Sequence, residues 1–254
     1  MGVSKSWSLE VATRSGRLRG DTDLTDTVAW RGIPFGAPPT GDRRWRAPRD
    51  PEAWTGVRQA IGFGSAPWMP GAEHSSEDCL SLNVWRPADA EAGLPVYVWL
   101  SGGGNQIQMP RISDTPGHLV ASRSRVVFVS ISYRVGEMGW LSHPALRDGD
   151  PLDGSGNYGT LDIIKGLEWV RDNIDAFGGD PGNVLIFGQS GGGGQNNGGQ
   201  PRSDATPNAA DHRRLGPNGL EHRRACRTDR HHGRRQFLHA RTHSTRGSRR
   251  AGER

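Results

Sequence analysis

The sequence predicts an α/β fold built on a mostly parallel sheet, and two observations support this prediction. First, residues 96–100, 126–131 and 184–187 are continuous apolar runs rich in β-branched side chains, as expected of strands covered on both faces in a parallel sheet. Second, apolar residues recur at helical spacing over 160–177, and parallel strands need such a crossover connection. The body of the chain therefore alternates strands with helices.

Short strands joined by turns are expected before these runs. Residues 11–13 and 17–19 flank a Ser-Gly pair at 15–16, which predicts a hairpin. Residues 34–78 are rich in Pro, Gly and Trp with little periodicity, so ordered loops that fold over a core are expected there. Residues 80–85 alternate apolar and polar side chains, which predicts a half-buried strand.

Two helices are expected to connect the apolar strands. The stronger one covers 160–177 and ends at the Gly-Gly-Asp-Pro stretch 178–181, which cannot continue a helix. A weaker helix is expected from about 114 to 122. In the stronger helix the apolar positions are Ile163, Leu167, Val170, Ile174 and Phe177, and the charged positions are Lys165, Glu168, Arg171, Asp172 and Asp175.

The composition changes abruptly after Gly194. Residues 195–254 contain 14 Arg and no Lys against 5 acidic residues, whereas all nine Trp and all three Tyr lie in 1–194. Such a tail cannot bury enough apolar surface to compensate for the entropy lost on ordering it. We therefore expect a folded region, 1–194, followed by a disordered low-complexity tail rich in Arg, His, Gly and Pro, 195–254.

The cysteine content and the hydropathy pattern limit the class of protein. Cys79 and Cys226 are too few for a disulfide framework. Cys79 is expected to be a small buried residue, with a bridge to an unknown partner as the alternative. The N-terminus lacks the apolar run of a secretion signal, and no segment approaches the ~20 apolar residues of a membrane span. We expect a cytoplasmic protein without a membrane partner, metal ion or other cofactor.

The stretch 188–192 reads Gly-Gln-Ser-Gly-Gly and directly follows the third apolar run. Gly-x-Ser-x-Gly after a buried strand holds a serine nucleophile, here Ser190, on a strained turn between strand and helix. Small residues flank such a serine because backbone segments approach closely there. A serine in a flexible glycine linker is the alternative, and the strand that precedes the motif argues against it.

A second glycine-rich stretch, Ser-Gly-Gly-Gly at 101–104, follows the strand 96–100. Acyl transfer passes through an oxyanion that preorganised backbone N–H groups stabilise. Glycines supply these groups without side chains that would block a substrate. Because both stretches follow parallel strands, where ligands bind in α/β sheets, we interpret 101–104 as part of an oxyanion hole rather than as a plain tight turn.

A series of short motifs runs through the chain in a fixed order. They are WRGIPF (30–35), RWRAP (44–48), SEDCLSLNVW (76–85), SYRVG (132–136), GNYG (156–159) and AFGGDP (176–181). Together with the Ser190 motif, this series resembles the type-B carboxylesterases, a carboxylesterase/lipase family of cholinesterase-like α/β-hydrolases. The resemblance covers about residues 10–194. It implies the N-terminal part of an α/β-hydrolase fold, incomplete, with N-terminal antiparallel strands beside the parallel ones.

The resemblance also implies an activity and its residues. Ser190 would attack a small-molecule carboxylic ester, and the amides of Gly103, Gly104 and Gly191 would hold the oxyanion during an acyl-enzyme mechanism. No cofactor or metal is implied.

Four charged residues match ion pairs of the family. The resemblance implies that Glu77 pairs with Arg44 and that Arg134 pairs with Asp162. We interpret both pairs as scaffold rather than as catalytic groups, because a buried pair can fix geometry without chemistry.

Two departures from the family pattern are small. Ser101 stands where many relatives have His, and the cysteine that often pairs with the position of Cys79 is missing near Ala66 and Pro67. The glycine amides remain, and the disulfide is expected to be absent.

The third departure concerns the base. In this fold the acid and the His follow the nucleophile in chain order, but after Gly194 the resemblance ends. We expect none of the tail histidines to be the base, and we expect the chain to be truncated or frameshifted and inactive as written. The tail histidines are His212, His222, His231, His232, His239 and His243.

Two other interpretations of the sequence compete with this one. A non-catalytic esterase-like binding module is the alternative function, and the intact Ser190 motif and glycine loop count against it. The Arg-rich tail would bind phosphates in a salt-dependent way, but it carries no recognised nucleic-acid motif, so no nucleic-acid partner is expected.

Overall fold

The computed structural model describes residues 7–108, 116–147, 149, 152 and 155–196, together with the backbone of 213–216 and 219–220. Cys226 and the six tail histidines lie outside the described residues. The boundary at 194 and the expected disorder of the tail stay predictions.

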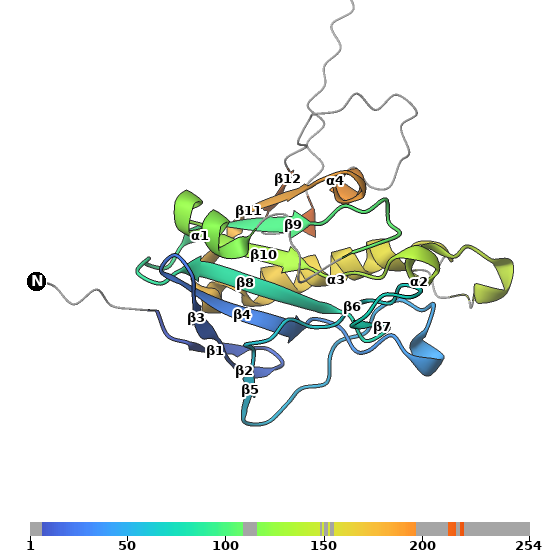
Figure 1. Ribbon diagram of the computed structural model, residues 1–254, viewed down its shortest axis with the longest axis horizontal. Helices are drawn as coiled ribbons and strands as arrows, with labels where there is room; N and C mark the ends of the chain where they lie inside the picture. The colour runs from blue at the N-terminus through green and yellow to red at the C-terminus, as the bar shows by residue number, and fades with distance from the viewer. Residues whose placement is uncertain are drawn as a thin grey trace, which may run out of the picture. The chain divides into compact units, whose positions relative to one another are not determined.

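The predicted α/β fold is confirmed by an eight-stranded sheet (Figure 1). The three apolar runs form the neighbouring strands β9 (Leu94–Leu100), β10 (Val127–Ile131) and β11 (Gly179–Gly188), and β9 lies between the other two and parallel to both. On the far side of β10, the antiparallel strands are β8 (Ser81–Pro87), β4 (Thr27–Pro34) and β3 (Asp21–Asp23).

The smaller strands lie apart from this sheet. The predicted hairpin is confirmed: β1 (Glu10–Thr13) pairs with β2 (Gly16–Arg19), and β2 pairs with β5 (Val57–Gln59). The loop region 34–78 also contains the pair β6 (Ala66–Pro67) and β7 (Ser75–Ser76) and the 3₁₀ turn η1 (Gly41–Arg43).

Both predicted helices are present. The stronger one is α3 (Tyr158–Asn173), which continues as a 3₁₀ turn, η3 (Ile174–Phe177), and stops at Gly178 with a left-handed φ of +77°. All five of its predicted apolar positions are buried. The weaker helix, α1, covers Gly117–Ser124. The remaining described helices are α2 (Gly136–Trp140), η2 (Pro144–Leu146) and α4 (Gly191–Asn196).

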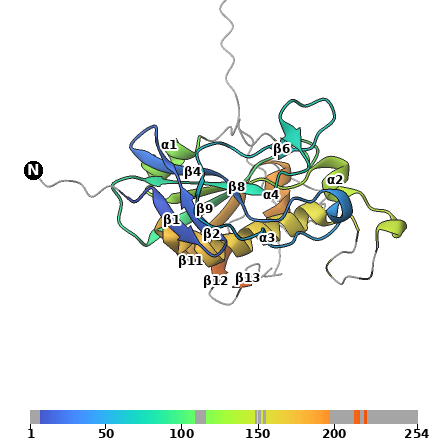
Figure 2. The same cartoon turned by 90° about the horizontal axis from the view of Figure 1, so that it is seen from below.

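Helices α1 and α3 cover opposite faces of the sheet (Figures 1 and 2). Val127 and Val129 of β10 belong to the large core cluster beneath α3, whereas Phe128 packs in a second cluster with Ala121 of α1. Successive strand residues point to opposite faces, so this alternation places one helix on each face. The apolar runs are therefore covered on both sides, as their composition predicts.

Strand β8 differs from its prediction. Its residues from Leu82 to Pro87 are all buried, so the half-buried prediction is wrong. The polar residue in the alternating pattern, Asn83, is buried because its amide is satisfied inside the protein: Nδ2 donates to Ser130 Oγ (3.0 Å) and Oδ1 accepts from Gly32 N (2.9 Å). A hydrogen-bonded amide removes most of the penalty for burying a polar group.

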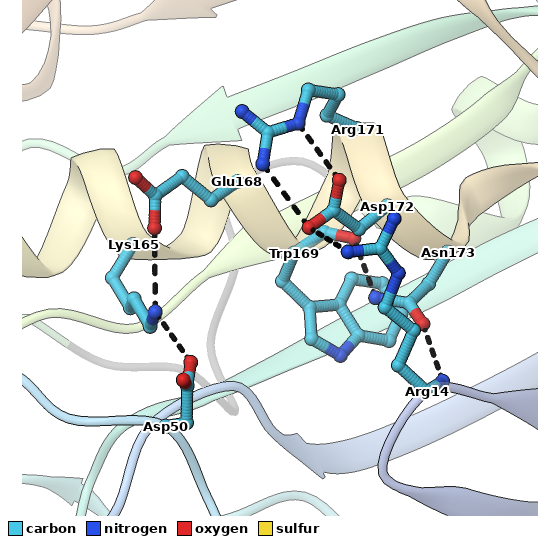
Figure 3. A network of polar contacts seen from close by, with 8 residues as sticks. All are labelled: Arg14, Asp50, Lys165, Glu168, Trp169, Arg171, Asp172 and Asn173. Atoms are coloured by element: carbon cyan, nitrogen blue, oxygen red, sulfur yellow. Dashed lines mark hydrogen bonds and ion pairs between the residues drawn. The ribbon is translucent and has the colours of Figure 1, made fainter.

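Charged side chains tie the outer surface of α3 to two loops (Figure 3). Lys165 forms ion pairs with Asp50 (2.5 Å) and Glu168 (3.3 Å), and Arg14 pairs with Asp172 (2.8 Å). The hydrogen bond that Arg171 donates, helped by the charges of Arg171 and Arg14, lowers the pKa of Asp172. We call this group of residues the α3 network; its other members are Trp169 and Asn173.

The order of the strands creates a switch point beside β9. From β9 the chain passes through α1 to β10 on one side, and from β10 it passes through α3 to β11 on the other side. In open α/β sheets, ligands bind in the crevice outside the carboxyl ends of strands at such a point. A ligand-binding site is therefore expected at the loops that follow β9 and β11.

Part of the predicted tail pairs with β11. The backbone of β12 (Arg213–Gly216) runs antiparallel to β11, with Arg214 opposite Leu185, and β13 (Gly219–Leu220) pairs with β12.

None of the helices in the described part of the chain has the length and apolar character that a membrane span requires.

Candidate active site

Ser190 sits at the sharp turn between β11 and α4. Its φ is +54°, in the left-handed region that non-glycine residues rarely adopt. A Cβ on Gly188 would stand 2.6 Å from the carbonyl carbon of Gly192, so the chain folds back tightly around the serine. Because Ser190 is exposed, its hydroxyl is open to a ligand.

The turn is pressed against the end of β9. A Cβ on Gly192 would stand only 2.1 Å from the carbonyl oxygen of Leu100 and 2.7 Å from that of Ser101. No larger residue fits without moving the backbone, which explains the glycine at this position of the motif. The turn that carries Ser190, called the nucleophile elbow below, therefore packs directly against the end of β9.

The glycine loop after β9 lies next to Ser190. Gly103 and Gly104 both have positive φ, +122° and +59°. A Cβ on Gly102 would stand 3.1 Å from the Ser190 Cβ, and a Cβ on Gly191 would stand 3.1 Å from the Gly104 nitrogen. The structure therefore brings the predicted nucleophile and the predicted oxyanion amides together.

Polar contacts fasten this loop to two helices. Gly136 N at the start of α2 donates to the Asn105 carbonyl (2.6 Å), and Gln195 Nε2 of α4 donates to Asn105 Oδ1 (3.3 Å). Thr160 of α3 donates to Gln195 Oε1 (3.1 Å). These contacts escaped the sequence analysis, which assigned no role to Asn105 or Gln195, because residues 30 or more positions apart meet only in the folded sheet.

The first of the two predicted ion pairs is buried. Arg134 donates from Nε and Nη2 to the two oxygens of Asp162 (2.8 and 2.7 Å), and its backbone N also donates to Oδ2 (3.0 Å). The side chains are 3% and 0% exposed. Arg134 also donates to the Arg46 carbonyl (2.9 Å), so the pair joins the end of β10 to α3 and to the loop at 46.

The second ion pair is closer to the surface. Arg44 donates from Nε and Nη2 to the two carboxylate oxygens of Glu77 (2.7 and 2.6 Å), and these hydrogen bonds raise the pKa of Arg44. Both predicted ion pairs are therefore present in the structure, and their role as scaffold stays a prediction.

Cys79 is a free, buried thiol. Burial raises its pKa well above the usual range, and the negative charge of Asp162 adds to this effect. The prediction of a small buried cysteine is therefore confirmed, and a protonated thiol of this kind is chemically inert.

No base accompanies the nucleophile in the described part of the chain. There the Ser190 hydroxyl has no hydrogen-bond partner, and His143 instead accepts a hydrogen bond from Ala145 N at the start of η2 (3.2 Å). Among the same residues, no group of three His, Cys, Asp or Glu side chains could hold a metal ion. The site as described consists of a serine and backbone amides.

A sheet covered on both faces, with a strained serine after one parallel strand and a glycine loop after its neighbour, defines an α/β-hydrolase fold. A profile of the carboxylesterase family matches residues 8–196, and the chain belongs to this family. Ser190, the glycine loop and both ion pairs lie within the matched region.

Individual relatives agree with this assignment. The chain is 43% identical over 190 residues to fumonisin B1 esterase of Sphingopyxis macrogoltabida and 37% identical over 192 residues to para-nitrobenzyl esterase of Bacillus subtilis. These matches cover 71% and 72% of the chain. A crystal structure of the Geobacillus stearothermophilus carboxylesterase superimposes with a TM-score of 0.68 at 40% identity, over 74% of this chain and 39% of that one.

The chain is much shorter than these relatives. The matched region spans 34% of the fumonisin B1 esterase and 38% of the para-nitrobenzyl esterase.

Proposed function

We propose that this chain supplies the nucleophile and the oxyanion hole of a carboxylic ester hydrolase. The observation that supports this most strongly is the left-handed backbone of Ser190 at a turn packed against the glycine loop, where an added Cβ on Gly102 would stand 3.1 Å from the Ser190 Cβ. A strained non-glycine residue costs about 1–3 kcal/mol, and such strain collects at functional sites. The proposed substrate is a small-molecule carboxylic ester, and no residue described here identifies which one.

The proposed reaction forms an acyl-enzyme. Ser190 Oγ attacks the ester carbonyl carbon, and the C=O π electrons move to the oxygen, which the amides of Gly103, Gly104 and Gly191 hold. The Ser190 Oγ proton passes to solvent water on attack, collapse of this intermediate breaks the ester C–O bond, and the leaving alkoxide takes a proton back from water to become the alcohol. Water then releases the acid from Ser190. One oxyanion donor contributes about 2.7–4 kcal/mol in such a site.

The absence of a base among the described residues sets the expected rate. An unassisted serine hydroxyl is a weak nucleophile, and the described residues offer Ser190 no proton acceptor. We propose that the chain as written is close to inactive, with only the roughly 10³–10⁴-fold acceleration over water that an oxyanion hole and binding can give.

A frameshift would account for the tail composition. Codons of a G+C-rich gene read out of frame would favour the Arg, His, Pro, Gly and Ala that fill residues 195–254. Translation of the nucleotide sequence after the Gly194 codon in the other two frames tests this. A frame that encodes apolar strands with a downstream acid and His supports it, and two frames without them refute it.

The alternative is a non-catalytic esterase-like binding module. One observation favours it, namely a serine without a base among the described residues. The cytoplasmic location and the absence of a nucleic-acid partner stay predictions under either function.

Labelling with a fluorophosphonate probe separates the two functions. The proposed hydrolase forms an adduct at Ser190, seen by intact mass and peptide mapping, and Ser190→Ala abolishes it. Ser155 is an internal control, because it also has a left-handed φ (+62°), but its Oγ accepts from the His143 backbone N (2.8 Å) and donates to the His143 carbonyl (3.1 Å). A folded sample that forms no adduct at Ser190 even when imidazole is added as an external base, or that labels Ser155 equally, refutes the proposed hydrolase.

A further inference from the structure

Gln108 lies just after the glycine loop, and its buried side chain joins the ends of two strands. Its Nε2 donates to Ser101 Oγ (2.8 Å) after β9 and to the Ile131 carbonyl (3.1 Å) at the end of β10. Its Oε1 accepts from Tyr133 N (3.0 Å) and Ser132 Oγ (3.4 Å). The side chain is 3% exposed, and every hydrogen-bonding position of its amide is used.

Tyr133 adds a second contact to the same point. Its hydroxyl donates to the Ser101 carbonyl (2.6 Å), so Ser101 is held through both its side chain and its backbone. Burial raises the pKa of Tyr133 to about 12, so this donor stays protonated well into the alkaline range. The group made of Gln108, Tyr133 and Ser101 carries no charge, and neutral hydrogen bonds are strengthened in such a dry interior.

Ser101 touches the nucleophile elbow on its other side. Its carbonyl oxygen lies against Gly192, where an added Cβ would stand 2.7 Å away, and the next residue, Gly102, lies against Ser190. The position of Ser101 on the sheet therefore sets how the loop faces the nucleophile.

The hydrogen bonds within the glycine loop fix its shape rather than its position on the sheet. Gln106 N and Ile107 N donate to the Gly103 carbonyl (2.9 and 3.2 Å), which fixes the shape of the turn. These bonds move with the loop, so they cannot fix its placement. Placement depends on the contacts of Gln108 and Tyr133 with Ser101, where the loop begins, and on those of Gly136 and Gln195 with Asn105 within the loop.

We propose that Gln108 is a positioning residue, which fixes the amides of Gly103 and Gly104 against Ser190 without touching the reacting atoms. The proposal rests on the proposed function, because the amides matter for chemistry only if Ser190 reacts. Losing Gln108 is expected to let the loop shift on the sheet, and a displacement of about 1 Å can slow a reaction by up to 100-fold.

The test compares Gln108→Ala with a matched control. Asn83→Ala also removes a buried amide that joins two strands, but its partners are Ser130 and Gly32. Hydrogen exchange of residues 101–107 is expected to be about tenfold faster in Gln108→Ala and unchanged in Asn83→Ala, and fluorophosphonate labelling of Ser190 about 10- to 100-fold slower only in the first. Unchanged exchange at 101–107 in folded Gln108→Ala, or an equal effect of Asn83→Ala, overturns the proposal.

A second variant keeps the proposal testable if Gln108→Ala does not fold. Gln108→Glu preserves the size of the side chain and the acceptor oxygen, but its carboxylate cannot donate to Ser101 Oγ or to the Ile131 carbonyl, and protonation restores only one of these two donors. Because burial raises the pKa of a carboxyl group, its labelling rate relative to the native chain is expected to recover as the pH falls from 10 to 5, and a constant ratio over this range contradicts the proposal. If the native chain forms no Ser190 adduct but exchange at 101–107 responds to Gln108→Ala, the proposed function fails and the positioning of the loop stands.

Discussion

The carboxyl ends of β9 and β11 and the outer surface of α3 are built on different principles. At the strand ends, backbone atoms of Gly102, Gly188 and Gly192 lie so close to neighbours that no side chain fits. In the α3 network, by contrast, the long charged side chains of Lys165 and Arg14 form ion pairs between the helix and loops (Figure 3).

The two regions are expected to tolerate substitution to different degrees. Packed backbone cannot relax around an added atom, and a buried charge cannot recover a lost partner from water. Exposed ion pairs re-solvate when a partner is removed and are screened by salt. The strand ends should therefore respond strongly to small substitutions, and the α3 network should respond weakly to larger ones.

The largest expected effect comes from the buried ion pair beside the strand ends. Asp162→Ala leaves the Arg134 guanidinium buried without its carboxylate and is expected to lower the free energy of unfolding by about 3–5 kcal/mol. Urea unfolding followed by fluorescence measures this. The matched change in the pair closer to the surface, Glu77→Ala, should cost less, and equal costs would show that burial does not separate the two pairs.

The second-largest loss of stability is expected from a substitution at Gly192, in the turn that carries Ser190. Gly192→Ala places a methyl group where the Leu100 carbonyl lies 2.1 Å away, so the turn must shift. We expect about 1–3 kcal/mol of destabilisation and loss of fluorophosphonate labelling at Ser190. Gly194→Ala is the control, because a Cβ there meets nothing within 4 Å. An unchanged labelling rate in Gly192→Ala would contradict the tight contact.

The Tyr133 hydroxyl, which hydrogen-bonds to Ser101 at the start of the glycine loop, is expected to make stability depend on alkaline pH. Burial raises the pKa of Tyr133 to about 12, above the value of about 10 in an unfolded chain. The resulting stability is complete below pH 10 and is lost as the pH rises toward 12, by up to about 2–3 kcal/mol. Tyr133→Phe should cost about 1 kcal/mol at pH 8 for the lost hydrogen bond and should lack this alkaline loss. Parallel pH profiles of the two proteins would refute the assignment.

The smallest effect is expected in the α3 network. Lys165→Met removes both ion pairs of this side chain and should change the free energy of unfolding by no more than about 1 kcal/mol, because the partner Asp50 is exposed. The difference should shrink further in 1 M salt. A loss as large as that of Asp162→Ala would contradict the contrast between the two regions.

The sequence predicted the parts of the site that depend on local backbone chemistry. The Ser190 motif, the glycine loop and the α3 periodicity could be found because a tight turn or a helix restricts nearby residue types. Gln108 and Tyr133 could not be found in this way. Their partners lie on different strands, and only the order β11, β9, β10 brings Ile131 and Ser101 to the same side chain.

The failure at β8 has a similar cause. The alternation over 80–85 indicated one wet face, but Asn83 is buried because Ser130 and Gly32, from two other segments, satisfy its amide. A polar residue in a strand therefore indicates a solvent-exposed face only when no neighbouring segment offers its side chain a hydrogen-bond partner.

Chemical rescue with imidazole tests most directly whether Ser190 lies in a formed oxyanion hole that lacks only a base. The rate of fluorophosphonate adduct formation at Ser190 is measured against imidazole concentration, with Ser190→Ala and the internal Ser155 as controls. We predict slow labelling without imidazole and a clear increase with it, confined to Ser190. A Ser190 rate that does not respond to imidazole, or the same response at Ser155, would contradict the assignment of Ser190 as a nucleophile that lacks its base.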